Sequence, residues 1–169
     1  MKQCSSETMY NFPMKLNSQQ LRELEVKRAQ GVVHKIKRNP IYFILENIYD
    51  TYNIGGVFRL ADAIAAKKIY LCGEMEIPPN SRIKKASIGT YKVVEWEYRK
   101  SASEVIADLR ETYNVKRKTL NDANKFQVPS FTFHVIAVEQ HEKALKYTKV
   151  DYKLPLALVF GNESYGVTP

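Results

Sequence analysis

The stretch NIYDTYNIGGVFRLADA (47–63) marks a change from one kind of secondary structure to another. The run IYFIL (41–45) directly before it has the length and the β-branched and aromatic content of a buried strand. After Gly56 the apolar residues recur at helical spacing. The sequence therefore predicts that Gly55 and Gly56 lie in a turn between a strand and a helix, where main-chain N–H groups can approach a ligand.

The same alternation of apolar runs and helical patterns continues along the chain. Strands are predicted at 40–46, 68–73, 91–98, 131–139 and 154–161, and helices at 17–31, 54–66, 102–111 and 141–147. The polar, basic run over 114–130 predicts a long loop, and residues 1–16 predict a flexible N-terminal arm before a single domain over 17–169. Such alternation is typical of an α/β fold, a mostly parallel sheet with helices on both faces and ligands at the carboxyl ends of the strands.

Composition narrows the classes of function. The 169 residues carry a net charge of +8, which favours polyanionic partners but also suits an ordinary solvated surface. Cys4 and Cys72 form no CxxC pair, so neither a disulfide framework nor a zinc site is indicated, and a reducing cytoplasm fits best. His34, His134 and His141 lack metal-ligand spacing, so no metal is expected. No apolar run approaches the ~18 residues that span a membrane.

The glycine pair predicts a ligand site without naming the ligand. Arg59 falls about one turn into the predicted helix, close enough to reach a ligand held by Asn53 and the glycines. The alternative is a tight turn in which Asn53 caps the helix and Arg59 lies on a solvated face. Neither GxGxxG nor GxxxxGK followed by Ser or Thr is present, which disfavours a nucleotide-binding protein of the Rossmann or P-loop type.

A second glycine-bearing strand end occurs in VFGNESYGVTP (159–169). Here an apolar run ends in Gly161, polar Asn162 and Glu163 follow, and Gly166 predicts a turn. Two strand ends of this kind, with carboxamide and carboxylate groups, make a composite pocket more plausible than either one alone.

Together these two stretches, as DTYNIGGVFRLADA and LVFGNESYG, resemble the SpoU (TrmH-like) branch of the SPOUT RNA methyltransferases. The segment IYLCGEMEIPPNSRIKKASIGTYKVVEWEY also resembles the family, with its Cys-Gly strand end, its Pro pair and its Ala-Ser-Ile-Gly-Thr turn, and the likeness covers about residues 20–169. The resemblance implies a SPOUT (α/β knot) fold and S-adenosyl-L-methionine as cofactor. It also implies methylation of a ribose 2′-hydroxyl in tRNA or rRNA, by a homodimer in which two subunits build each active site.

The resemblance also implies roles for individual residues. Asn53, Arg59 and Glu163 correspond to the catalytic set, with Arg59 as the main catalytic residue. An arginine is a poor general base because its pKa exceeds ~12, so we expect Arg59 to bind the hydroxyl and an adjacent phosphate and to stabilise negative charge. Asn53 would bridge loop and ribose, and Glu163 would orient Arg59 or Asn53, its alternative role being an N-cap. The residues expected against the cofactor are Val138, Glu139, Gly161 and Asn162.

Basic and hydroxyl side chains elsewhere are candidates for contact with RNA. Lys84 and Lys85 are expected to meet phosphate and Ser87 and Thr90 to touch RNA, although a capped turn with a solvated charge pair explains the same residues. The basic run at 116–118 is a candidate for contact with the RNA backbone, with a solvated loop as its alternative.

The family's third motif, which returns through the knot and supplies much of the adenosine pocket, belongs beyond Pro169. We therefore expect this chain to lack the C-terminal trefoil-knot segment and to be a fragment of a longer methyltransferase. The alternative is a catalytically inactive RNA-binding module, which would retain the basic charge and the first motif but would not bind the cofactor.

Overall fold

The computed structural model describes residues 19–20, 23, 26–27, 37–123 and 132–167. The predicted arm over 1–16 lies outside the described residues, as does most of the helix expected over 17–31.

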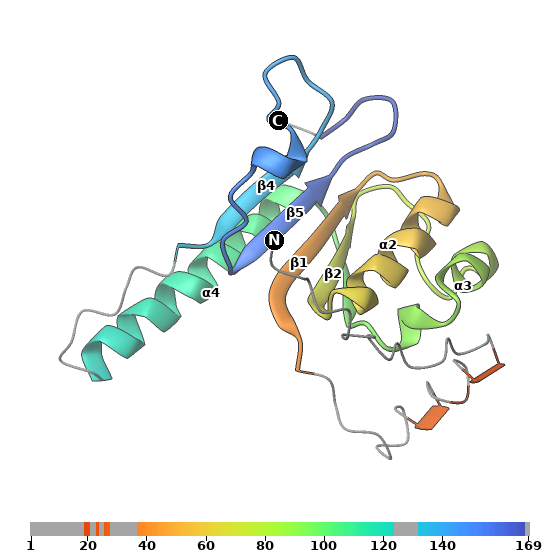
Figure 1. Cartoon of the computed structure of the whole chain (residues 1–169), viewed down its shortest axis with the longest axis horizontal. Helices are drawn as coiled ribbons and strands as arrows, with labels where there is room; N and C mark the ends of the chain where they lie inside the picture. The colour runs from red at the N-terminus through yellow and green to blue at the C-terminus, as the bar shows by residue number, and fades with distance from the viewer. Residues whose placement is uncertain (1–18, 21–22, 24–25, 28–36, 124–131, 168–169) are drawn as a thin grey trace, which may run out of the picture.

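A single sheet of five parallel strands forms the centre of the molecule (Figure 1). The strands are β1 (Asn39–Glu46), β2 (Ala66–Cys72), β3 (Trp96–Arg99), β4 (His134–Val138) and β5 (Leu156–Phe160). Their spatial order is β3-β2-β1-β5-β4, and every neighbouring pair is parallel. The chain builds the sheet outward from β1 in both directions, so the strand order reverses beside β1. In open parallel sheets, ligands bind in the crevice at such a reversal, outside the carboxyl ends of the strands.

Helices cover both faces of the sheet, as the sequence predicted (Figure 1). The helices are α2 (Thr51–Ala63), α3 (Ser81–Ser87) and α4 (Ala102–Ala123), with short 3₁₀ segments η1 (Thr90–Lys92) and η2 (Tyr147–Lys149). Consecutive strand residues alternate between two cores because their side chains point to opposite faces. Phe43 packs with Phe58 of α2, whereas Ile44 packs with Val105 of α4.

Three predicted elements were wrong. The helix expected over 141–147 is an exposed turn followed by η2, because its seven residues find no surface on which to bury an apolar face. The loop expected over 114–130 is helical as far as Ala123, since α4 continues through the polar stretch. The strand expected from residue 91 begins only at Trp96, after η1. Helix α3 was not predicted.

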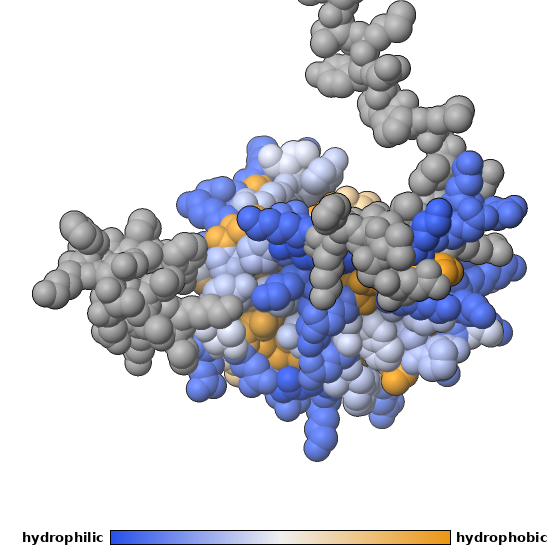
Figure 2. Space-filling model, turned by 90° about the horizontal axis from the view of Figure 1, so that it is seen from below, coloured by the Kyte–Doolittle hydropathy of each residue, from blue (hydrophilic) through white to orange (hydrophobic). Residues whose placement is uncertain are grey.

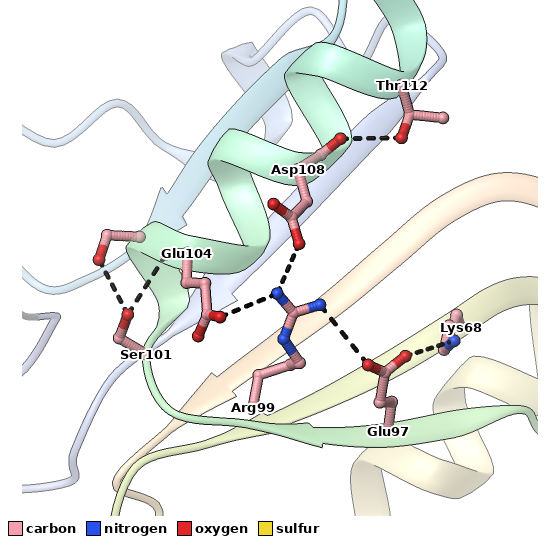
Figure 3. A network of polar contacts seen from close by, with 8 residues as sticks. Lys68, Glu97, Arg99, Ser101, Glu104, Asp108 and Thr112 are labelled. Atoms are coloured by element: carbon pink, nitrogen blue, oxygen red, sulfur yellow. Dashed lines mark hydrogen bonds and ion pairs between the residues drawn. The ribbon is translucent and has the colours of Figure 1, made fainter.

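Charged side chains join the edge strand β3 to α4 (Figure 3). The Arg99 guanidinium pairs with Asp108, and it also pairs with Glu104 at 3.1 Å. The hydrogen bonds from Arg99 to Asp108, first, and to Glu104 raise the pKa of Arg99. Lys68 of β2 pairs with Glu97 at 2.8 Å, which lowers the pKa of that carboxyl. Ion pairs whose carboxylates are this accessible each contribute little to stability, and together these contacts link β2 to β3 and β3 to the first turns of α4.

Seen from the amino ends of the strands, the surface is mostly hydrophilic and its apolar residues lie in small separate groups (Figure 2). The concave site described next lies at the opposite, carboxyl ends of the strands.

Candidate active site

A cleft of about 680 Å³ lies where the carboxyl ends of β1, β4 and β5 meet α2. This volume falls within the ~300–1,000 Å³ that is usual for small-molecule sites. The lining residues are Leu45, Ile48, Tyr52, Asn53, Gly56, Val57, Leu60, Val138, Glu139, Gln140, Phe160, Gly161, Asn162 and Glu163. The two glycine-bearing strand ends that were predicted to form a composite pocket therefore do meet in one cleft.

The glycine pair lies inside α2 and not in the turn before it, so that prediction was wrong. Asp50 caps the helix by accepting a hydrogen bond from the N–H of Tyr52 at 2.7 Å, which also excludes Asn53 as the cap. Gly55 is needed for close packing, because a Cβ there would lie 2.4 Å from Cβ of Ala86 in α3. Gly56 faces the cleft, where a Cβ would meet nothing within 4 Å.

Glu163 ties the end of β5 to the start of α2. Its carboxylate accepts hydrogen bonds from the N–H groups of Tyr49 and Asp50 at 3.3 and 3.2 Å, and from Nδ2 of Asn53 at 3.2 Å. Burial alone would raise the pKa of Glu163, but these hydrogen bonds and one from its own N–H outweigh burial and lower the pKa. The group is therefore held as an anion, with its lone pairs directed at three donors.

Asn162 shapes the turn that carries Glu163. Its Nδ2 donates to the carbonyl of Asn47 at 2.8 Å, and its Oδ1 accepts from the N–H of Ser164 at 2.8 Å. The main chains of Asn162 and Gly166 exchange two hydrogen bonds of 2.9 Å, which close the turn. A Cβ at Gly161 would lie 2.0 Å from the carbonyl oxygen of Gly166, so only glycine allows this closure.

Glu139 holds the same turn from the side of β4. Its Oε2 accepts a hydrogen bond from the N–H of Val167 at 2.9 Å, and its Oε1 accepts one from the N–H of Gln140 at 2.9 Å. Gly166 has a φ of +74°, and a Cβ there would lie 2.2 Å from Oε2 of Glu139. Two carboxylates, Glu139 and Glu163, thus fasten one turn to two different strand ends.

Arg59 lies beside the cleft and not within its lining. It is exposed, and it follows Gly55 by one helical turn, on the side of α2 that approaches α3. Among the residues that the structure describes, no side chain or carbonyl forms an ion pair or hydrogen bond with its guanidinium. The structure therefore brings Asn53 and Glu163 into contact and leaves Arg59 available to a partner outside the monomer.

The other residues expected to contact RNA lie on or just after α3, which packs against α2 at Gly55, and none of them lines the cleft. Lys84 and Lys85 are exposed on α3, near its end. Ser87 is fully buried and donates to the carbonyl of Lys84, and Thr90 donates to the carbonyl of Ser87 at 2.8 Å. The burial of Ser87 argues against the contact with RNA expected for it. The run at 116–118 lies within α4, in a part whose side chains are outside the described structure.

The sequence reasoning missed several residues that line the cleft, among them Tyr52, Leu60 and Gln140. A signal for Leu60 was present, because Asn53, Gly56 and Leu60 follow one another at helical spacing and so share one face of α2. Placing the helix start at Asp50 would have revealed that face. Within the described residues no helix is long and apolar enough to cross a membrane, and no three metal-ligating side chains cluster.

Comparison with known proteins agrees with this architecture. A tRNA (guanosine(18)-2′-O)-methyltransferase from Aquifex aeolicus is 25% identical over 150 residues, which cover 87% of this chain and 60% of that protein. The fold resembles an AdoMet-bound rRNA methyltransferase from Sinorhizobium meliloti, with a TM-score of 0.57, 22% identity, and coverage of 81% of this chain and 44% of the other.

The SpoU methyltransferase AviRb from Streptomyces viridochromogenes, in complex with AdoMet, gives a TM-score of 0.59 at 17% identity, with coverage of 79% and 47%. These two likenesses confirm the fold class that the sequence predicted. The chain spans 60 to 66% of the length of the tRNA methyltransferases that it matches. The model of the SpoU rRNA Methylase family matches residues 40–169, and the chain therefore belongs to that family.

Proposed function

We propose that this chain carries the cleft of an RNA methyltransferase that uses S-adenosyl-L-methionine to methylate a ribose 2′-hydroxyl of tRNA or rRNA. One observation carries the proposal: the Asn53–Glu163 contact, which joins both family motifs at the strand-order reversal of the sheet. Membership of the SpoU family and the two AdoMet-bound structures of the same fold support it.

The residues present fit such a cofactor. Leu45, Val57 and Phe160 give the cleft apolar walls. Gly56 leaves open space in the cleft that a side chain at this position would occupy. Two carboxylates at its edge, Glu139 and Glu163, supply negative potential suited to a cationic sulfonium group. We propose that the main chain at Val138–Gln140 and at Gly161–Asn162 would hold the cofactor, which would supply an electrophilic methyl group.

The chain's own residues then have to orient a hydroxyl and stabilise charge. Arg59 is exposed beside the cleft, and we assign to it the binding of the ribose hydroxyl and a neighbouring phosphate as negative charge develops on the oxygen. The proton leaves to phosphate or water, because a guanidinium does not accept it at neutral pH. Asn53 orients the ribose. Since Glu163 is committed to three donors, we assign it the positioning of Asn53.

The proposed partners follow from charge and exposure. Lys84, Lys85 and Thr90 are proposed to contact RNA, supported by the net charge of +8 and by the exposure of both lysines. A second copy of the chain is proposed to cover the exposed apolar side chains Tyr52 and Leu60 beside the cleft. The buried free thiol of Cys72 fits a reducing compartment, and we propose the cytoplasm.

Isothermal titration with S-adenosyl-L-methionine and a methyl-transfer assay on tRNA and rRNA test the proposal together. For a protein that carries this chain together with the third motif, we expect cofactor binding, methyl transfer, and a variant Arg59→Ala that loses transfer while its cofactor affinity stays within about twofold. Equal loss of both properties would contradict the role of Arg59. Binding of RNA without binding of cofactor would instead identify a non-catalytic RNA-binding module.

A further inference from the structure

The connection between β4 and β5 (residues 139–155) is unusual for a parallel crossover because it contains no α-helix. Figure 1 shows it in blue, extending beyond the arrowhead of β4 before it returns to the start of β5. Large side chains along it are exposed: Leu145 by 69% and Tyr147 by 78%. Because Tyr147 is exposed to this extent, its side chain offers a large area for contact with a partner.

Local hydrogen bonds fix the backbone that carries the Tyr147 ring. The chain turns back directly after β4, where the N–H of Ala144 donates to the carbonyl of His141 at 2.9 Å. The N–H of Lys149 donates to the carbonyl of Lys146 at 2.8 Å, and the hydroxyl of Tyr152 donates to the carbonyl of Tyr147 at 3.0 Å. The ring of Tyr147 is thus presented to solvent from an ordered turn.

Three lysines close to Tyr147 in the sequence lack ion-pair partners in the described structure. Lys143, Lys146 and Lys149 are exposed, and within the described part of the chain none of them forms an ion pair. The fourth lysine of the segment, Lys153, pairs with Asp151 at 3.0 Å. Glu142 precedes Lys143 and is also exposed, so these three lysines outnumber the acid of the same turn. Exposed lysines close in sequence to an exposed aromatic side chain match a ligand that combines phosphates with planar rings, which is single-stranded nucleic acid.

We propose that residues 143–152 form a tyrosine–lysine surface that binds a single-stranded stretch of the RNA substrate. Tyr147 stacks on a base, and Lys146 and Lys149 contact flanking phosphates. Tyr147 follows the cleft residue Gln140 by seven positions, so it lies at most about 25 Å away. The inference rests on the proposed function, and it adds a contact that orients the RNA next to the reacting ribose.

Binding of a single-stranded RNA oligonucleotide and of an unmodified tRNA transcript, followed by fluorescence anisotropy over a range of salt concentrations, tests this surface. We expect Tyr147→Ala to weaken binding about tenfold with an unchanged salt slope, because stacking involves no counterion release. Tyr147→Phe keeps the ring and should stay within about twofold of the wild type. The double change Lys146→Ala and Lys149→Ala should reduce the slope of log K against log salt by about 1.4.

Matched controls lie at the other edge of the sheet. Tyr98 is 47% exposed on β3, and Lys100 is exposed directly after that strand. Tyr98→Ala and Lys100→Ala should leave affinity and salt slope unchanged. A thermal melt of each variant establishes that the fold is intact, and the salt slope of the double lysine variant still tests the surface if Tyr147→Ala fails to fold.

The outcomes separate this inference from the proposed function. If the wild type binds S-adenosyl-L-methionine and RNA but both surface variants bind RNA like Tyr98→Ala, the surface is not an RNA contact and only this inference fails. If a wild-type protein that also carries the third motif binds no cofactor and transfers no methyl group, the proposed function fails. A change of oligomeric state in Tyr147→Ala on sedimentation, without loss of RNA affinity, would assign the surface to a protein partner and overturn the inference.

Discussion

Oε1 of Glu163 accepts a hydrogen bond from Nδ2 of Asn53 at 3.2 Å, and so joins two residues that lie 110 positions apart in the chain. The contact is possible because β1 and β5 are adjacent parallel strands, whose carboxyl ends deliver the start of α2 and the turn at 161–167 to one place. The same carboxylate also accepts from the N–H groups of Tyr49 and Asp50. One side chain therefore fixes both the side-chain amide and the main-chain entry to α2.

Removing this carboxylate should cost stability. We expect Glu163→Ala to lower the free energy of unfolding by about 1–2 kcal/mol, because it leaves main-chain donors at the entry to α2 without their anionic acceptor. Asn53→Ala removes one exposed hydrogen bond and should cost about 0.5–1 kcal/mol. Urea unfolding of both single variants and the double variant measures the coupling. Strictly additive losses would contradict the contact.

The carboxylate of Glu163 should also make the stability of the protein depend on pH. The pKa of Glu163 is lowered in the folded protein from its usual value of 4.5, so the unfolded chain binds the proton more readily. The stabilisation from the carboxylate is therefore complete at neutral pH and disappears as the pH falls below about 4.5 and through the folded pKa. The gap in unfolding free energy between the wild type and Glu163→Gln should shrink over that interval. A gap that stays constant down to the acid transition would refute this prediction.

The sequence was sufficient to locate the parts of the site that are set by strand ends. β1 and β5 are short apolar runs that end in polar, glycine-bearing segments, and parallel pairing brings such ends together without further information. The convergence of Asn53, Asn162 and Glu163 could therefore be predicted, although the individual hydrogen bonds could not.

The sequence was insufficient where tertiary packing decides the conformation. A glycine pair usually indicates a turn, but Gly55 lies inside a helix. The residue is a glycine because Ala86 of α3 leaves no room for a side chain, and α3 itself was not predicted. Conversely, the segment at 141–147 has helix-forming residues but no apolar surface to pack against, and it forms no helix. The first error arises from a contact between elements that are distant in sequence, and the second from the lack of one.

The two adjacent glycines provide a matched pair of substitutions. Gly55→Ala should destabilise the fold by about 1–3 kcal/mol, because the new methyl group would meet Cβ of Ala86 and the main chain of Ser87, neither of which is a flexible end. Gly56→Ala should stabilise it by about 0.5–1 kcal/mol, because the site is helical, exposed and open. Thermal or urea unfolding distinguishes the two. Equal effects would show that helix propensity, and not the contact with α3, governs both positions.

Glu139 and Gly166 should prove energetically coupled through the turn that they share. An alanine at Gly166 must adopt a φ of +74° and would crowd Oε2 of Glu139, which has to move and so release the N–H of Val167. We expect Gly166→Ala to cost about 2–3 kcal/mol in the wild-type background. In the background Glu139→Ala the crowding is absent and only the backbone strain of about 1 kcal/mol remains. Urea unfolding of the four proteins tests this, and the same penalty in both backgrounds would mean that the carboxylate does not hold the turn.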